Sequence, residues 1–427
     1  MKARLLAALA AAAILLSLAP AAAAAEPPEV TRAAGACLYN VENDVTLLAV
    51  NDDARIYPAS TVKLMTGILA LEALGGDMTA TITVTAEMLS GVVGNNIGLK
   101  TGEVVTVGDM LHALLVNGSN DAAQVLAVAT AGSVDAFVAQ MNQKAQLLGA
   151  YSTYYTNPTG MHSDGMITTV ADTLAIARYA YRLPGFTDIT SVSKYVMDTT
   201  NKSDYRNLYN RNAQLSKFYD TRYYYPDALG MNAGYTAQAG YCLVSAAQRN
   251  SLTYLCVVMN AEDDDNGIYS YENARTLLDW AFESYAYLEV LSDKERVAEM
   301  PVSLSSAVDY VTLVPAAAIV RYLPVDTDLS RVRVATVTHG ETLVAPVEAG
   351  QICGTATVTL DDEILGSVDL VATTSVSRSE FLYLLERIKA FTAGRFFRAS
   401  VVFLIVFSVL YVLWEARRRE QLLRRRR

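Results

Sequence analysis

The chain has 427 residues, 52% of them hydrophobic and 18% charged, with a formal net charge of −10 at pH 7. This length allows about two domains besides targeting segments. Residues 1–25 carry +2 and residues 415–427 carry +5, so the intervening part carries −17, which argues against nucleic acid as a partner.

The N-terminus is typical of a secretory signal peptide. A short basic region with Lys2 and Arg4 precedes an apolar stretch, and an alanine run ends at Ala25. We therefore assign residues 1–25 to a cleaved signal and exclude them from the fold.

A hairpin and an apolar helix are predicted next. Residues 36–51, "ACLYNVENDVTLLAVN", form two strand-like runs around a polar turn. Residues 60–74 are nearly all apolar and stop at a glycine pair, which predicts a buried helix. Ser60 and Lys63 at its start are three residues apart, so both side chains lie on one helix face. A lysine whose pKa is lowered by burial can take the proton of a serine nucleophile.

The remainder of this region predicts an α+β domain. Helical patterns are followed by two strands and a last helix: helices at 107–116, 122–131, 133–148 and 170–181, strands at 240–246 and 253–260, and a helix at 271–285. Strands near both ends of the region, with helices between, favour an antiparallel sheet flanked by helices.

The hydrophobic pattern of the sequence changes after residue 287. Short alternating runs separated by turns predict a small all-β domain at 288–376, and "SEFLYLLERIKAF" predicts an amphipathic helix within a linker at 377–398. Residues 399–414 carry no charge and, with flanking Phe and Arg residues, predict a transmembrane helix. Seven arginines in residues 415–427 predict a cytoplasmic tail, so we expect one C-terminal span in the cell membrane and an extracytoplasmic catalytic domain.

The cysteines and histidines indicate no metal site. Their spacing fits no set of metal ligands, and the cysteines lie in apolar runs, which favours buried free thiols: Cys37, Cys242, Cys256 and Cys353. A Cys242–Cys256 bridge stays open. The three scattered histidines lend no support to a Ser-His-Asp triad.

Two later segments complete a pattern with Ser60 and Lys63. "LLVNGSNDAAQVLA" places Ser119, Asn120 and Asp121 in a loop between two helices, and "LGMNAGYTAQAGYCLVSA" places residues 230–236 just before a strand. This order is that of the S-x-x-K, S-x-N and K-T-G motifs. Over about residues 30–376 the chain resembles the D-alanyl-D-alanine carboxypeptidases among the low-molecular-weight penicillin-binding proteins, with further similar segments such as "RIYPASTVKLMTGILALEAL" and "APVEAGQICGTATVTLDDEILGSVDLVA".

The resemblance implies a fold. It predicts a penicillin-binding/β-lactamase-like transpeptidase domain at 26–287, followed by the all-β domain and the membrane helix.

The resemblance also implies an activity without metal or organic cofactor. Ser60 would attack the carbonyl between two D-alanines of a peptidoglycan stem peptide, and Lys63 would take its proton. Asn120 would position the substrate amide, with Ser119 beside it. The same resemblance predicts β-lactam antibiotics as acylating inhibitors.

The strand after residue 230 would bind substrate in this family. Asn232, Gly234 and Thr236 are the matching positions, and the N–H groups of Ser60 and Thr236 would form the oxyanion hole.

Two departures from the family pattern predict slow turnover. Gly118 stands where the S-x-N serine belongs, with Ser119 one position late, and "NAG" at 232–234 replaces K-T-G. Loss of the lysine charge would cost about 10- to 100-fold in rate. A literal "KTG" at 100–102 comes before the asparagine segment, and we interpret it as an ordinary turn.

Other functions stay open. The main alternative is a catalytically degraded protein of this fold that binds stem peptides or a partner. A β-lactamase fits the all-β domain and membrane helix poorly.

Overall fold

The computed structural model describes residues 26–218 and 220–424. The described residues up to Ala286 form one compact unit, and those from Tyr287 onward form another. The predicted signal peptide lies outside the described residues.

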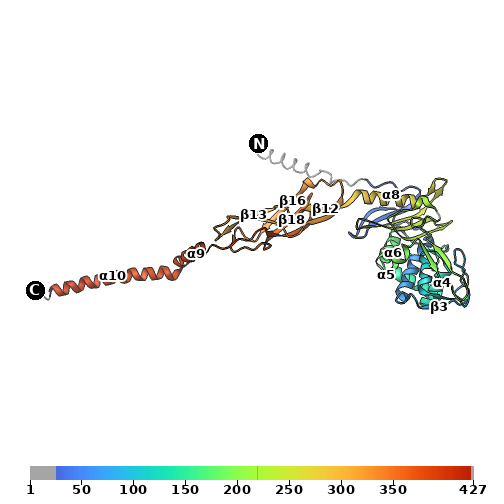
Figure 1. Cartoon of the computed structure of the whole chain (residues 1–427), viewed down its shortest axis with the longest axis horizontal. Helices are drawn as coiled ribbons and strands as arrows, with labels where there is room; N and C mark the ends of the chain where they lie inside the picture. Colours follow the sequence, from blue (N-terminus) through green and yellow to red (C-terminus); the bar gives the residue numbers. More distant parts are fainter. Residues whose placement is uncertain (1–25, 219, 425–427) are drawn as a thin grey trace, which may run out of the picture. The chain divides into compact units, whose positions relative to one another are not determined.

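A five-stranded antiparallel sheet organises the first unit (Figure 1). Its strand order is β2-β1-β9-β8-β7, built from β1 (Ala33–Asn40), β2 (Val45–Val50), β7 (Ala228–Thr236), β8 (Gly240–Arg249) and β9 (Leu252–Ala261). The strands from both ends of the unit pair directly, with Leu38 opposite Cys256. The predicted hairpin and the two late strands are therefore confirmed. The central strand β9 is almost entirely buried, which explains its nearly continuous apolar run.

Helices cover both faces of this sheet. They are α2 (Val62–Leu74), α3 (Val107–Leu115), α4 (Asn120–Ala131), α5 (Val134–Leu147), α6 (Val170–Arg182), α7 (Phe186–Thr190) and α8 (Tyr269–Ser284). In Figure 1, α8 lies along one face of the sheet and α6 along the other. All helices predicted from apolar periodicity are present within a few residues of the expected bounds.

The helix that carries the Ser-x-x-Lys motif lies inside the helical layer. Helix α2 packs against α3, α4 and α6, and Leu64, Met65 and Ile68 are fully buried. A helix surrounded in this way is apolar on all sides, which matches its sequence. A short 3-10 helix, η1 (Ala59–Thr61), precedes it.

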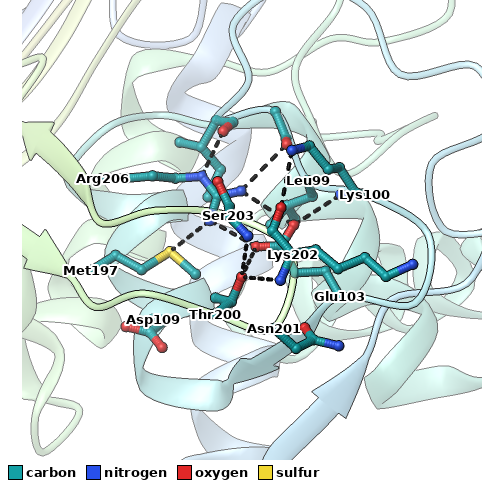
Figure 2. Close-up of polar contacts among 12 residues, drawn as sticks. Leu99, Lys100, Glu103, Asp109, Met197, Thr200, Asn201, Lys202, Ser203 and Arg206 are labelled. Atoms are coloured by element: carbon teal, nitrogen blue, oxygen red, sulfur yellow. Dashed lines mark hydrogen bonds and ion pairs between the residues drawn. The ribbon is translucent and has the colours of Figure 1, made fainter.

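Several short elements were not predicted from the sequence. They are η2 (Thr221–Tyr223) and the strand pairs β3 (Thr81–Thr83) with β4 (Val104–Thr106), β5 (Lys194–Met197) with β6 (Arg206–Tyr209), and β10 (Asp263–Asp264) with β11 (Gly267–Ile268). Figure 2 shows how β6 is tied to the segment before β4. Arg206 Nη1 lies 2.8 Å from the fully buried Glu103 Oε1, which also accepts a 2.8 Å hydrogen bond from Thr200 Oγ1.

The second unit begins with a β domain that has its own core. Its strands are β12 (Tyr285–Leu291), β13 (Ala298–Ser303), β14 (Tyr310–Pro315), β15 (Ile319–Pro324), β16 (Val332–Thr338), β17 (Leu343–Val344), β18 (Ile352–Leu360) and β19 (Glu363–Ala372), with η3 (Leu329–Arg331) between β15 and β16. The largest sheet has the order β16-β18-β19-β14-β13-β17. Leu313, Cys353 and Leu370 are fully buried in it. The all-β texture predicted from alternation is confirmed.

Two helices end the described chain. They are α9 (Glu380–Ala393) and α10 (Arg395–Arg424). Residues 395–419 of α10 are long and apolar enough to span a membrane, and none of that apolar stretch is buried. The candidate span is thus longer than the predicted 399–414.

Candidate active site

Ser60 and Lys63 lie together at the start of α2. Lys63 Nζ is 3.2 Å from Ser60 Oγ and donates a 2.6 Å hydrogen bond to the carbonyl oxygen of Thr159. The Lys63 side chain is 1% exposed. The serine and lysine of the motif are therefore within reach of each other.

A strained backbone presents Ser60. The preceding Ala59 has a φ of +47°, a region that non-glycine residues rarely adopt. Gly160 packs directly on it, since a Cβ at Gly160 would lie 2.0 Å from the carbonyl oxygen of Ala59. Backbone strain of this kind clusters at functional sites, where surrounding structure holds it.

A polar turn holds the carbonyl group to which Lys63 donates its hydrogen bond. The side-chain Oδ1 of Asn157 accepts hydrogen bonds from the N–H groups of Thr159 and Gly160, at 3.1 and 2.9 Å. This turn fixes the Thr159 carbonyl beneath Lys63. The sequence reasoning did not single out Thr159; the "NPTG" turn signal at 157–160 was the available clue.

Burial and charge make Lys63 a base. Burial, with a smaller contribution from the positive charge of Arg211, lowers the pKa of Lys63 to about 7. A neutral amine that donates to Thr159 still has a lone pair for the Ser60 hydroxyl proton. The pair can therefore perform nucleophilic catalysis of acyl transfer.

Asn120 begins α4 and Ser119 precedes it as the N-cap residue, so the predicted loop placement was wrong for Asn120 and for Asp121, which lies in the first turn of the helix. Asn120 Nδ2 donates a 2.7 Å hydrogen bond to the Val93 carbonyl, while its buried Oδ1 accepts none from the described residues. Ser119 is fully buried and its Oγ donates to Asn117 Oδ1 at 2.9 Å.

Gly118 lines the Ser60 pocket, whereas Ser119 is not among the described lining residues. Gly118 has a φ of +73°. Gly118 is the position where the family pattern expects a serine.

Residues 230–236 come just before strand β8, as predicted, and themselves belong to strand β7, the strand that the resemblance places after residue 230. Gly234 passes so close to the nucleophile that a Cβ there would lie 2.6 Å from Ser60 N. Gly234 and Thr236 line the pocket. Asn232 is 5% exposed, stands outside the described lining, and its Oδ1 accepts no hydrogen bond from the described residues.

The pocket over Ser60 encloses about 540 Å³. Four tyrosines contribute to its wall: Tyr223, Tyr235, Tyr241 and Tyr271. Tyr235 lies against Tyr241 with ring centroids 4.5 Å apart, and Tyr223 stacks on Tyr271 at 4.8 Å. Tyr223 and Tyr271 match no motif, and Tyr235 and Tyr241 lie beside the third motif but were not singled out, because the motif does not include them.

The literal Lys100-Thr101-Gly102 triplet is part of a structural turn, as predicted, and Figure 2 shows Lys100 of this triplet near Lys202. Lys100 Nζ donates to the carbonyl oxygen of Lys202 at 3.0 Å, and Lys202 Nζ donates to that of Thr101 at 2.8 Å. None of the three residues is among the described residues that line the Ser60 pocket.

All four cysteines lie in the described part of the chain as buried free thiols, so the Cys242–Cys256 bridge is not formed. Burial raises the pKa of Cys242 to about 12, which leaves its thiol protonated and inert at neutral pH.

Family models match both units of the chain. Residues 21–263 match the model for D-alanyl-D-alanine carboxypeptidase, and residues 285–378 match that for the penicillin-binding protein 5 C-terminal domain.

Individual relatives agree with these matches. The D-alanyl-D-alanine carboxypeptidase DacF of Bacillus subtilis is 29% identical over 363 residues, covering 84% of this chain and 87% of the relative. DacB2 of Mycobacterium tuberculosis is 32% identical over 227 residues, covering 53% and 74%. Penicillin-binding protein 5 of Haemophilus influenzae is similar in structure, with a TM-score of 0.58, 26% identity, and coverage of 83% and 100%. The chain belongs to the family of serine D-alanyl-D-alanine carboxypeptidases.

Proposed function

We propose that this chain removes the terminal D-alanine from peptidoglycan stem peptides through an acyl-enzyme at Ser60. The observation that carries the proposal is the 3.2 Å approach of Ser60 Oγ to Nζ of the buried Lys63, whose pKa is lowered to about 7. Family membership and the open pocket above the serine support it.

The first half-reaction forms the acyl-enzyme. Lys63 takes the hydroxyl proton as Ser60 Oγ attacks the carbonyl carbon between the two D-alanines. The resulting oxyanion is held by the N–H groups of Ser60 and of a residue on β7, with Thr236 as the expected one. The Oδ1 of Asn120, which has no hydrogen-bond partner among the described residues, accepts the substrate amide N–H. The C–N bond breaks as the leaving amine takes the proton that Lys63 had accepted from Ser60, so that Lys63 is neutral again and D-alanine leaves.

The second half-reaction releases the shortened peptide. Water attacks the Ser60 ester, its proton passes to Lys63, and the serine hydroxyl is restored. Ser119, whose hydroxyl is bonded to Asn117 Oδ1, would have to turn to take part in proton delivery. Because Asn232 is uncharged and buried, we expect slow turnover.

We also propose a domain organisation and a membrane topology. Residues 26–287 form the catalytic domain, 288–376 the β domain, and 377–398 the linker. Helix α10 holds the protein in the cell membrane, with the catalytic domain outside and residues 415–427 in the cytoplasm. β-Lactam antibiotics are the expected acylating inhibitors.

A second candidate is a protein that binds stem peptides without cleaving them. Two observations favour it: Asn232 is buried, and the Ser119 hydroxyl is hydrogen-bonded to Asn117 Oδ1. Release of D-alanine from a peptide ending in D-Ala-D-Ala separates the two. Release that Ser60→Ala abolishes supports the enzyme. Covalent labelling by penicillin without D-alanine release supports the binding protein.

A further inference from the structure

An irregular segment, residues 93–99, contributes to the wall of the Ser60 pocket and belongs to none of the motifs. Gly94 in this segment lines the pocket, and a Cβ there would lie 2.9 Å from Asn120 Nδ2. The carbonyl oxygen of Val93 accepts the 2.7 Å hydrogen bond from Asn120 Nδ2. The segment therefore contacts the side chain that we expect to bind the substrate amide.

The bond to Val93 sets which way the Asn120 amide points. A side-chain amide has one oxygen and one nitrogen, so a nitrogen held by Val93 leaves the oxygen for another partner. That oxygen, Oδ1, is buried and accepts no hydrogen bond from the described residues, and Asn120 lines the pocket. If the segment moved, the amide could turn and present its N–H groups, which cannot accept a hydrogen bond from a substrate amide.

Asp121, the next residue along the chain, holds this segment against helix α4. Asp121 is 2% exposed and lies in the first turn of the helix. Its Oδ2 accepts hydrogen bonds from the N–H groups of Ile97 and Leu99, both at 3.1 Å. Hydrogen bonds from backbone N–H groups to a carboxylate are about twice as strong as those between neutral groups. The carboxylate is therefore a firm attachment point for the segment.

Two further contacts hold the same segment. Arg206 Nε donates a 2.9 Å hydrogen bond to the carbonyl oxygen of Ile97, and Asn95 Nδ2 donates one of 2.7 Å to that of Asn117. These contacts remain when the carboxylate is removed. We therefore expect its removal to shift the segment and the amide of the motif asparagine, and not to unfold the domain.

We propose that Asp121 is a positioning residue for the reaction: it fixes residues 93–99 and thereby keeps Asn120 Oδ1 turned toward the substrate amide. Asp121 itself is not among the described residues that line the pocket, so it acts through its neighbour. This inference rests on the proposed function in one respect, the role of Asn120 as acceptor of an amide N–H.

The test compares acylation of Ser60 by two penams, benzylpenicillin, which has an acylamino N–H, and penicillanic acid, which lacks that group. Both rate constants are measured by competition with a fluorescent penicillin. Asp121→Ala removes both acceptor oxygens, and Asp121→Asn keeps one. Asp172→Ala is the matched control, because Asp172 is also buried in the first turn of a helix and accepts a 2.8 Å hydrogen bond from the Ser152 N–H, outside the described pocket lining. Thermal unfolding checks that each variant is folded.

We expect Asp121→Ala to lower the rate with benzylpenicillin by about 10-fold and to leave that with penicillanic acid within about three-fold of the parent. Only benzylpenicillin offers an N–H to Asn120. Asp121→Asn should lose less than Asp121→Ala, and Asp172→Ala should change neither rate. Equal losses with both penams, or no loss with either, would overturn the inference. If Asp121→Ala does not fold, Asp121→Asn replaces it, and a loss below about three-fold confined to neither penam counts against the inference.

A double-mutant cycle shows whether Asp121 acts through Asn120. In the Asn120→Ala background, Asp121→Ala should cost less than about three-fold with benzylpenicillin, because the side chain that it positions is absent. A purely structural role would cost the same factor in both backgrounds. Losses that multiply would therefore overturn the inference.

Failure of this inference is distinguishable from failure of the proposed function. Acylation by penicillin does not require release of D-alanine, so the proposed function can fail while these rates still decide the inference. If the parent reacts with neither penam, calorimetric titration with a peptide ending in D-Ala-D-Ala replaces the rates. A loss of affinity in Asp121→Ala that disappears in the Asn120→Ala background supports the inference. An equal loss in both backgrounds, or no binding by the parent, overturns it.

Discussion

Gly234→Ala should separate strand β7 from the nucleophile. A Cβ at this position would lie 2.6 Å from both the N and Cβ atoms of Ser60 and 2.9 Å from its Cα. Carbon atoms in favourable contact are about 3.5–4.0 Å apart. The atoms in conflict belong mostly to backbone that is already strained at Ala59, so they cannot turn aside as a flexible side chain can.

The expected effect on rate exceeds the effect on stability. Relief of the conflict requires the strand and η1 to move apart by about 1 Å, and a misplacement of that size can cost about 100-fold in rate. Overpacking of this kind destabilises a protein by about 1–3 kcal/mol. We therefore predict that Gly234→Ala folds, with a lowered unfolding temperature, and is acylated by penicillin about 100-fold more slowly.

The assay is the second-order rate constant for labelling by a fluorescent penicillin, measured with thermal unfolding of the same samples. Gly76→Ala is the matched control, because a Cβ there meets nothing within 4 Å and the residue lies in the same unit. It should change neither quantity. If folded Gly234→Ala reacts within about three-fold of the parent, the close approach of β7 to Ser60 does not shape the site as argued.

The remaining predictions concern the base, the third motif and the membrane helix. Because the pKa of Lys63 is lowered to about 7, the acylation rate should rise as pH increases through about 7 and then level off, and a flat profile from about pH 6 to 9 would exclude Lys63 as the base. Asn232→Lys with Ala233→Thr should raise kcat/KM for a peptide ending in D-Ala-D-Ala by about ten-fold and that for its amide little. No gain on either peptide, with penicillin still acylating Ser60, would favour the binding protein. A tag after Arg427 should survive protease added to intact protoplasts while the catalytic domain is digested, and digestion of both, or of neither, would contradict this topology.

Periodicity and motif order predicted much of the fold. The apolar run of α2 and the strand runs of β8 and β9 are long, and their packing confirms them. The alternation after residue 287 likewise predicted β structure, because buried residues alternate with more accessible ones along strands such as β14 and β18. Ser60 and Lys63 could be paired from spacing alone, because three residues is about one helical turn.

The parts that sequence could not predict depend on long-range contacts. Nothing local to Arg211 indicates that its side chain flanks Gly118, since their proximity comes from a backbone hydrogen bond to Val116 far along the chain. Short strands such as β5 and β6 hold too few residues for a pattern and are stabilised by the buried Glu103–Arg206 pair. Likewise, burial of Asn232 is decided by what packs around β7.

Covalent labelling by penicillin shows whether Ser60 is the nucleophile. Full-length protein is incubated with a fluorescent penicillin, and the modified peptide is located by mass spectrometry beside a Ser60→Ala sample. The account predicts one adduct on the peptide that contains Ser60, absent in Ser60→Ala and formed orders of magnitude more slowly in Lys63→Ala, because the hydroxyl then lacks its base. Equal labelling of the Ser60→Ala protein, or no labelling of the parent, would contradict it.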